Sequence, residues 1–183
     1  MKTNRLSETI FAALNSQLTK EAHAAQIYLS LGTWADDKGY EGISNFLFRH
    51  ANEERNHMMK FLEYILDRGA KPVIEPIPGP IEDPQNVQNC FNKVFEQEVE
   101  NTTAIYKIVK LSLVEEDWAT WNFLQWFVKE QIEEETLSLK LLDKIKIAGG
   151  EKATDEALQT LDKELEHTSD DLPSATNATQ ANP

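Results

Sequence analysis

Four segments of this chain repeat apolar residues at helical spacing, and each carries a glutamate where the repeat points inward. The first repeat steps by four, three, four and three residues, so its glutamate shares a helix face with its apolar residues: Leu14, Leu18, Glu21, Ala25 and Tyr28. The other inward glutamates are Glu54, Glu98 and Glu134. This chain can fold as a helical bundle only if the bundle centre accommodates several carboxylates.

An ionised carboxylate is costly to bury, so it must take up a proton, pair with a cation or bind a metal. No Lys or Arg lies on the same stripes, which points to a cation from outside the chain. His57 follows Glu54 by three residues and shares its face, as two ligands of one metal must. Carboxylates with one imidazole suit iron(II) or a similar divalent ion, and four glutamates offset the charge of two ions. Glu54, nearest the histidine, is the expected shared ligand.

The same pattern has a simpler interpretation for any single position. If the helix register is misread by one residue, the glutamate turns toward solvent and needs no metal. Four such glutamates, one in each segment, make that interpretation unfavourable for the set.

The helical pattern predicts an all-α fold. We expect long helices over about 6–36, 42–68, 84–115 and 118–148, and a short fifth helix from Thr154 or Asp155 to about His167. Asp83 is the expected N-cap of the third helix, with Pro84 at its first position. The proline-rich stretch 72–84 cannot be helical throughout and predicts one long crossover between helices two and three, as in ferritin-like four-helix bundles.

Length and composition predict one domain. A chain of 183 residues with 40% hydrophobic content fills one core, which we place at 1–167. The polar segment 168–183 is expected to be a disordered tail. The short fifth helix has too narrow an apolar stripe to stand alone, so it must dock on something.

The charge balance excludes several partners. Eighteen Lys and Arg against 31 Asp and Glu give a formal charge of −13, which repels nucleic acid and anionic membranes and attracts cations. No apolar run reaches the roughly 20 residues that span a bilayer, so we expect a cytoplasmic protein. The single cysteine, Cys90, excludes Cys-based zinc or iron–sulfur clusters.

Several sequence elements also match a known family. In order along the chain they are Glu21-x6-Tyr28, the run Arg49-His50-Ala51-Asn52-Glu53-Glu54-Arg55-Asn56-His57, Glu98, and Asn122-Phe123-Leu124-Gln125-Trp126 followed by Glu130-Gln131-x-Glu133-Glu134-Glu135. Their spacing covers about residues 6–167. The chain resembles the non-haem ferritins of the bacterial type.

This resemblance implies a ferroxidase that oxidises Fe(II) with dioxygen or peroxide and stores the ferric product in a shell of twenty-four identical subunits. It implies two irons per subunit and no haem. By analogy, Glu21, Glu54 and His57 hold the first iron, Glu54, Glu98 and Glu134 hold the second, and Gln131 lies beside the second.

The resemblance also implies a third iron site nearby, whose carboxylates would be Glu53, Glu130, Glu133 and Glu134. An ordinary solvated acidic face would explain the first three equally simply. Tyr28 is expected near the irons as an electron donor or hydrogen-bond partner, although packing alone explains a tyrosine there. Trp126 is expected to be a core aromatic first and a redox group second.

The remaining histidines, His23, His50 and His167, fall outside the ligand pattern and are expected to be exposed or structurally bonded. Cys90 is expected to be a small core or surface residue.

Related families fit less well. A haem-containing bacterioferritin would place a Glu-x-x-His pair on the fourth helix and a methionine after the bridging glutamate, where this chain has Gln131-x-x-Glu134 and Arg55. A rubrerythrin needs a Cys-rich module, and the DNA-shielding mini-ferritins lack a fifth helix.

Two alternatives from other classes remain. A non-catalytic shell subunit would build the shell without oxidising iron, and it predicts the loss of ligands that this chain retains. A di-iron oxidase of another type would act on an organic substrate; the acidic composition and the fifth helix argue against it.

Overall fold

The computed structural model describes residues 4–79 and 82–166. These residues form five α-helices and one 3-10 turn: α1 Glu8–Asp37, α2 Glu41–Asp67, α3 Val87–Val114, α4 Trp118–Ile147, η1 Gly150–Lys152 and α5 Asp155–Glu166. No strand occurs among the described residues. The predicted all-α ferritin-like fold is therefore confirmed, and the predicted helix limits agree to within two residues except at the start of α3.

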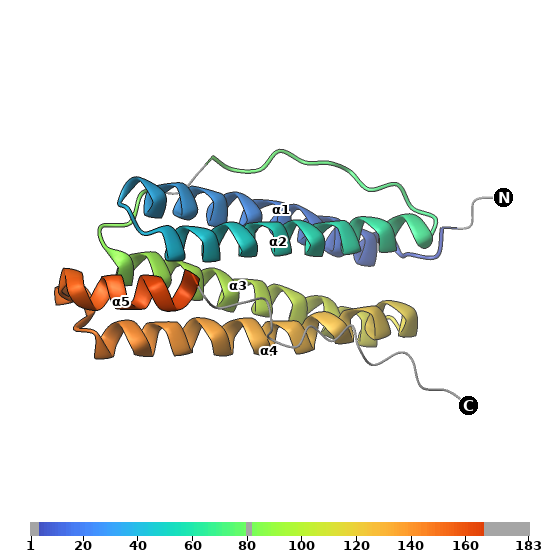
Figure 1. Cartoon of the computed structure of the whole chain (residues 1–183). Helices are drawn as coiled ribbons and strands as arrows, with labels where there is room; N and C mark the ends of the chain where they lie inside the picture. Colours follow the sequence, from blue (N-terminus) through green and yellow to red (C-terminus); the bar gives the residue numbers. More distant parts are fainter. Residues whose placement is uncertain (1–3, 80–81, 167–183) are drawn as a thin grey trace, which may run out of the picture.

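The first four helices form an elongated bundle of two antiparallel pairs. Figure 1 shows α1 with α2 on one side and α3 with α4 on the other. The crossover runs outside α1 along the bundle and returns the chain to the end where α2 began, so α2 and α3 run parallel (Figure 1). Asn15 of α1 fastens this crossover, because its side chain donates to the Val73 carbonyl at 3.0 Å and accepts from the Val73 N–H at 2.8 Å.

Side-chain caps explain where the helices begin. Ser7 accepts a hydrogen bond from the Ile10 N–H at the start of α1, and Asp117 accepts one from the Thr120 N–H at the start of α4. The predicted start of α3 is wrong, because its N-cap is Asn86 and not Asp83. The Asn86 side chain accepts from the Asn89 N–H at 2.8 Å, and the helix begins at Val87.

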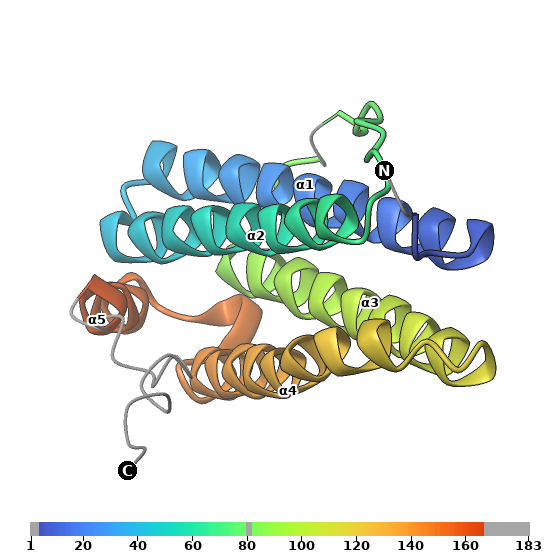
Figure 2. The ribbon, with the colours of Figure 1, turned by 90° about the vertical axis from the view of Figure 1, so that its right-hand side faces the viewer.

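Helix α2 receives its cap from α5. Its own N-cap residue, Tyr40, makes no side-chain cap, but Asp162 Oδ1 accepts a hydrogen bond from the Ile43 N–H at 2.8 Å. The two helices approach so closely at Gly42 that a Cβ there would lie 1.8 Å from the Asp162 carbonyl oxygen. In Figure 2 α5 is viewed nearly end-on while α1–α4 run across the view, so α5 crosses the end of the bundle obliquely.

The predicted start of α5 is confirmed, and Thr154 Oγ1 caps the helix by accepting from the Ala157 N–H at 3.3 Å. Leu161 and Leu165 pack into the core against the start of α2, which is the docking that the narrow stripe required.

The interior contains two apolar clusters separated by a polar centre. The cluster at the α5 end includes Leu31, Phe46 and Phe91, and the opposite cluster includes Phe61 and Phe127. Between them lie the buried side chains of the inward glutamates and their neighbours. Cys90 is a small buried core residue, as expected.

Other sequence-based expectations have different outcomes. His167 and the predicted tail 168–183 lie outside the described residues. Within the helices that the structure describes, none is both long enough and apolar enough to cross a membrane.

Candidate metal centre

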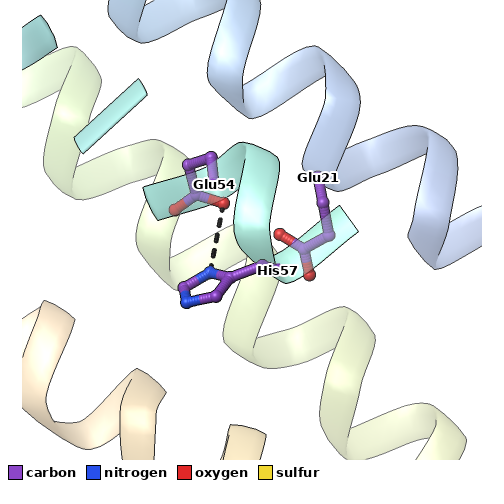
Figure 3. A group of neighbouring side chains, drawn as sticks. All are labelled: Glu21, Glu54 and His57. Atoms are coloured by element: carbon purple, nitrogen blue, oxygen red, sulfur yellow. Dashed lines mark ion pairs between the residues drawn. The ribbon is translucent and has the colours of Figure 1, made fainter. Parts of the chain in front are cut away.

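Three predicted ligands meet in the polar centre of the bundle. Glu21 comes from α1, and Glu54 and His57 come from successive inward positions of α2. One ligand atom from each lies within 4.8 Å of the other two, close enough to coordinate a single ion (Figure 3). All three are at most 2% exposed, so the inward direction predicted from the helical stripes is confirmed.

Two atoms of this group have no hydrogen-bond partner. Glu54 Oε2 and His57 Nδ1 are buried and unsatisfied, and they lie 3.6 Å apart (Figure 3). A buried polar atom without a partner is costly. Since both are electron-pair donors aimed into one space, a divalent cation between them would satisfy both at once. The donor set therefore fits a metal ion.

Two amides orient the carboxylate of Glu21. Gln17 Nε2 donates to Glu21 Oε1 at 2.8 Å, and Asn101 Nδ2 on α3 donates to Glu21 Oε2 at 3.2 Å. Gln17 Nε2 also donates to Asn101 Oδ1. Glu21 is thus held across the α1–α3 contact before any ion binds.

Two hydrogen-bond donors orient the carboxylate of Glu98 on α3, as two amides orient that of Glu21. Tyr28 OH donates to Glu98 Oε1 at 2.6 Å, and Gln131 Nε2 donates to Glu98 Oε2 at 3.2 Å. Glu98 is 1% exposed and Gln131 is fully buried, so both occupy the inward positions predicted for them. The expected placement of Tyr28 beside the carboxylates is found, and it acts there as a hydrogen-bond donor.

Further candidate groups lie between α2 and α4. His50, Glu53 and Glu134 form one group with ligand atoms within 4.8 Å of one another, and Glu53, His57 and Glu130 form another. His50 Nε2 lies 3.8 Å from Glu134 Oε2. His50 Nδ1 lies 3.0 Å from the Phe46 carbonyl oxygen of its own helix, so His50 is structurally bonded, as expected. The packing of α2 against α4 also brings its other ring nitrogen beside Glu134.

Glu133 joins none of these groups among the described residues. It is exposed, and its carboxylate lies 3.5 Å from Lys129 Nζ. His23 also lies apart, on α1 facing the crossover. Trp126 is half-buried; its ring centroid is 5.4 Å from that of His57, and Lys60 Nζ lies 4.6 Å over the ring.

Burial controls the acidity of the centre. Desolvation, and then the neighbouring Glu54, raise the pKa of Glu21 well above its ordinary value. Desolvation followed by the charge of Glu98 does the same to the pKa values of Glu54 and Glu134. The pKa of Glu98 is also raised by burial, although the hydrogen bonds from Tyr28 and Gln131 oppose that rise. A cation would reverse these shifts, because it stabilises the ionised form.

Comparison with known proteins identifies the fold and the family. The family model described as ferritin-like domain matches residues 11–148. The chain is 36% identical over 144 residues to the bacterial non-heme ferritin of Campylobacter jejuni, covering 79% of this chain and 86% of that one. The chain belongs to the ferritin family.

Other members of the ferritin family agree over a longer span. The bacterial non-heme ferritin of Escherichia coli O157:H7 is 32% identical over 160 residues, covering 87% of this chain and 95% of its own. The crystal structure of an open pore ferritin from the archaeon Archaeoglobus fulgidus superposes with a TM-score of 0.85 at 35% identity, covering 90% of this chain and 99% of that one. The resemblance noted from the sequence is confirmed, and membership of the ferritin family supports iron storage.

Three groups near the predicted ligands of this ferritin were missed in the sequence: the buried amides Gln17 and Asn101, and the partly buried His50. A signal existed for the first two, because Gln17 precedes Glu21 by four residues and Asn101 follows Glu98 by three, which places each on its glutamate's face.

Proposed function

We propose that this chain is a ferroxidase subunit of an iron-storing ferritin. The observation that carries the proposal is the buried group of Glu21, Glu54 and His57, in which Glu54 Oε2 and His57 Nδ1 have no hydrogen-bond partner within the described chain. Fe(II) is here a substrate, so the site must bind it, oxidise it and release it.

We assign the first iron position to Glu21, Glu54 and His57, and the second to Glu54, Glu98 and Glu134. Glu54 is assigned to both positions by family resemblance, and its buried carboxylate lies near enough to Glu98 and Glu134 for their charges to raise its pKa. Gln131 lies beside the second position, where it supports Glu98 by hydrogen bonding. Buried carboxylates and one imidazole suit Fe(II).

Pairing the irons matches the chemistry of the oxidant. Each Fe(II) gives up one electron, so two ions supply the two electrons that reduce dioxygen, with two protons, to hydrogen peroxide. The same two electrons reduce peroxide, with two protons, to water. Ferric ions are stabilised by the anionic centre, which carries four glutamates and no neighbouring Lys or Arg on its inward stripes.

A third iron position is proposed at the more accessible edge of the centre. Glu53 and Glu134 with His50 form one group there, and Glu53 and Glu130 with His57 form another. Glu133 belongs to this proposed site by family resemblance and lies exposed on the same helix as Glu130 and Glu134. Its role is as an accessory ligand.

Assembly into a shell of twenty-four copies is also proposed. The end of α3 exposes Leu113 and Val114 by 45% and 72%, and Trp118 at the start of α4 is 62% exposed. Exposed apolar side chains that gather on a surface favour protein–protein contacts. Light scattering should give about twenty-four times the chain mass of 20.9 kDa, and a stable monomer would reject assembly.

The test of the ferroxidase is an anaerobic Fe(II) titration followed by admission of oxygen. Two Fe(II) ions should bind per chain, or three if the third position fills, and oxygen should then produce ferric absorbance rapidly. Binding without rapid oxidation would favour the second candidate, a non-catalytic shell subunit. Rapid oxidation only in the presence of an organic substrate would favour a di-iron oxidase of another type.

A further inference from the structure

Three buried side-chain amides connect the carboxylates of the metal centre. We call Gln17, Asn101 and Gln131 the amide relay; they are at most 3% exposed and come from α1, α3 and α4. Gln131 was already placed beside the second iron position. Gln17 and Asn101 have no place in the proposed ligand sets.

Each donor of the amide relay reaches a carboxylate or the next amide oxygen, and Gln131 Nε2 also donates to the Glu98 carbonyl and to Thr102 Oγ1. Gln17 donates to Glu21 and to the oxygen of Asn101. Asn101 donates to Glu21 Oε2 at 3.2 Å and to Gln131 Oε1 at 3.5 Å. Gln131 in turn donates to Glu98 Oε2 at 3.2 Å. The relay therefore runs from a ligand of the first ion to a ligand of the second.

The orientation of Asn101 is fixed by its neighbours. Its Oδ1 faces the NH2 group of Gln17, and its Nδ2 faces the carboxylate of Glu21. Turning the amide over would place its oxygen against the carboxylate and against Gln131 Oε1, and its NH2 against the NH2 of Gln17, losing all three hydrogen bonds. Asn101 thus has one favourable arrangement, and that arrangement fixes both oxygens of Glu21 together with Gln17.

We propose that Asn101 is a positioning residue for the first iron, which it controls through Glu21. This inference rests on the proposed ferroxidase site. A carboxylate that already has its hydrogen bonds needs little reordering when the ion arrives, and partners of this outer kind raise metal affinity. Because Asn101 lies one turn after Glu98 on α3, it also ties Glu21 of α1 to the helix that carries a ligand of the second ion.

The test measures Zn(II) affinity by isothermal titration, since zinc binds without being oxidised. The parent chain is compared with Asn101→Leu, which keeps the size of the side chain and removes its hydrogen bonds. Both proteins are also measured with Glu134→Ala added. This change removes a ligand of the second ion, so the titration then reports the affinity of the first ion alone. We expect Asn101→Leu to weaken binding of the first ion by about 10–100-fold and to leave the second ion within the parent range.

The matched control is Ser112→Ala, another buried polar residue of α3, whose hydroxyl bonds only to the Val109 carbonyl of its own helix. It should bind both ions like the parent. Thermal melts of the metal-free chains distinguish a positioning role from a merely structural one. A structural role would lower the melting temperature without weakening the affinity of the first ion selectively. If Asn101→Leu does not fold, Gln17→Met removes the other donor to Glu21 and should also weaken the first ion.

Each outcome decides the proposal. Equal affinity of the first ion in the parent and in Asn101→Leu, or in Gln17→Met where the former does not fold, would overturn the positioning role alone. Equal weakening of both ions would also overturn it, since that pattern reports general damage. A folded parent that takes up no zinc would overturn the proposed ferroxidase site and this inference with it.

Discussion

The hydroxyl of Tyr28 donates a hydrogen bond to Glu98 Oε1 at 2.6 Å across the buried contact between α1 and α3. This bond opposes the effect of burial on Glu98, whose pKa is raised by desolvation and lowered by its hydrogen bonds to Tyr28 and Gln131. Tyr28 therefore favours the ionised carboxylate that a cation requires.

Tyr28→Phe removes that donor, so the pKa of Glu98 should rise further and the second ion should need a higher pH to bind. The measurement is zinc affinity against pH, where the mutant curve should shift to higher pH. Tyr106→Phe, on the exposed face of α3, is the matched control. Identical curves for Tyr28→Phe and the parent would remove this role of Tyr28.

Metal binding should release protons. The pKa values of Glu21, Glu54 and Glu134 are raised above the ordinary 4.5, first by desolvation, so these carboxyls hold protons at a pH where exposed ones have lost them. An incoming cation displaces those protons, and affinity rises with pH. Titrations in buffers of different ionisation enthalpy count the protons. A count of zero across mildly acidic pH would contradict the raised pKa values.

The metal-free chain should lose stability as pH rises. A carboxyl whose pKa is higher when folded than when unfolded binds more protons in the folded state, so unfolding becomes easier as pH rises above the unfolded value near 4.5. Glu54→Gln removes one such group, and one oxygen of that carboxylate, Oε2, has no hydrogen-bond partner. Its melting temperature at neutral pH should exceed that of the parent.

Glu63→Gln, exposed on the same helix, is the control for this experiment and should melt like the parent. A metal-free Glu54→Gln that melts below the parent would show that charge crowding does not limit stability.

The helical pattern predicted most of this architecture because apolar periodicity and turn residues are local. The start of α3 was misplaced because two capping residues lie three positions apart, and only the bond from the Asn89 N–H to Asn86 decides between them. His50 was set aside for a different reason: its distance of 3.8 Å to Glu134 depends on how α2 packs against α4, which no stripe on one helix encodes.

The position of α5 could not be predicted from the helical pattern either, because the pattern indicated only that this helix must pack against another part of the structure.

Asp162→Ala should remove the cap from the start of α2 and cost about 1 kcal/mol of unfolding free energy, the usual cost of losing an N-cap. Denaturant unfolding measures this. Glu156→Ala, on the exposed side of α5, is the control, and equal values for the two variants would argue against the cap.

Gly42→Ala should disturb the same contact more strongly, since the added Cβ would meet the Asp162 carbonyl oxygen at 1.8 Å. We expect α5 to shift away and its amides to exchange faster with solvent. Hydrogen exchange of residues 155–166 measures this, and unchanged protection in the mutant would show that the approach is not constrained at Gly42.

Glu54→Ala tests the proposed shared ligand. Rapid Fe(II) oxidation should slow by roughly 100-fold or more, because loss of an outer partner alone costs 10–100-fold. Stopped-flow absorbance after mixing with oxygen measures the rate, with Glu63→Ala as the control. Oxidation at the parent rate would exclude Glu54 from the site.

The central claim is that divalent cations occupy the carboxylate-rich centre of the bundle. Anomalous diffraction from crystals soaked in ferrous salt without oxygen tests it most directly. The account predicts one peak among Glu21, Glu54 and His57 and a second beside Glu98 and Glu134. A map without anomalous density between these helices would contradict it.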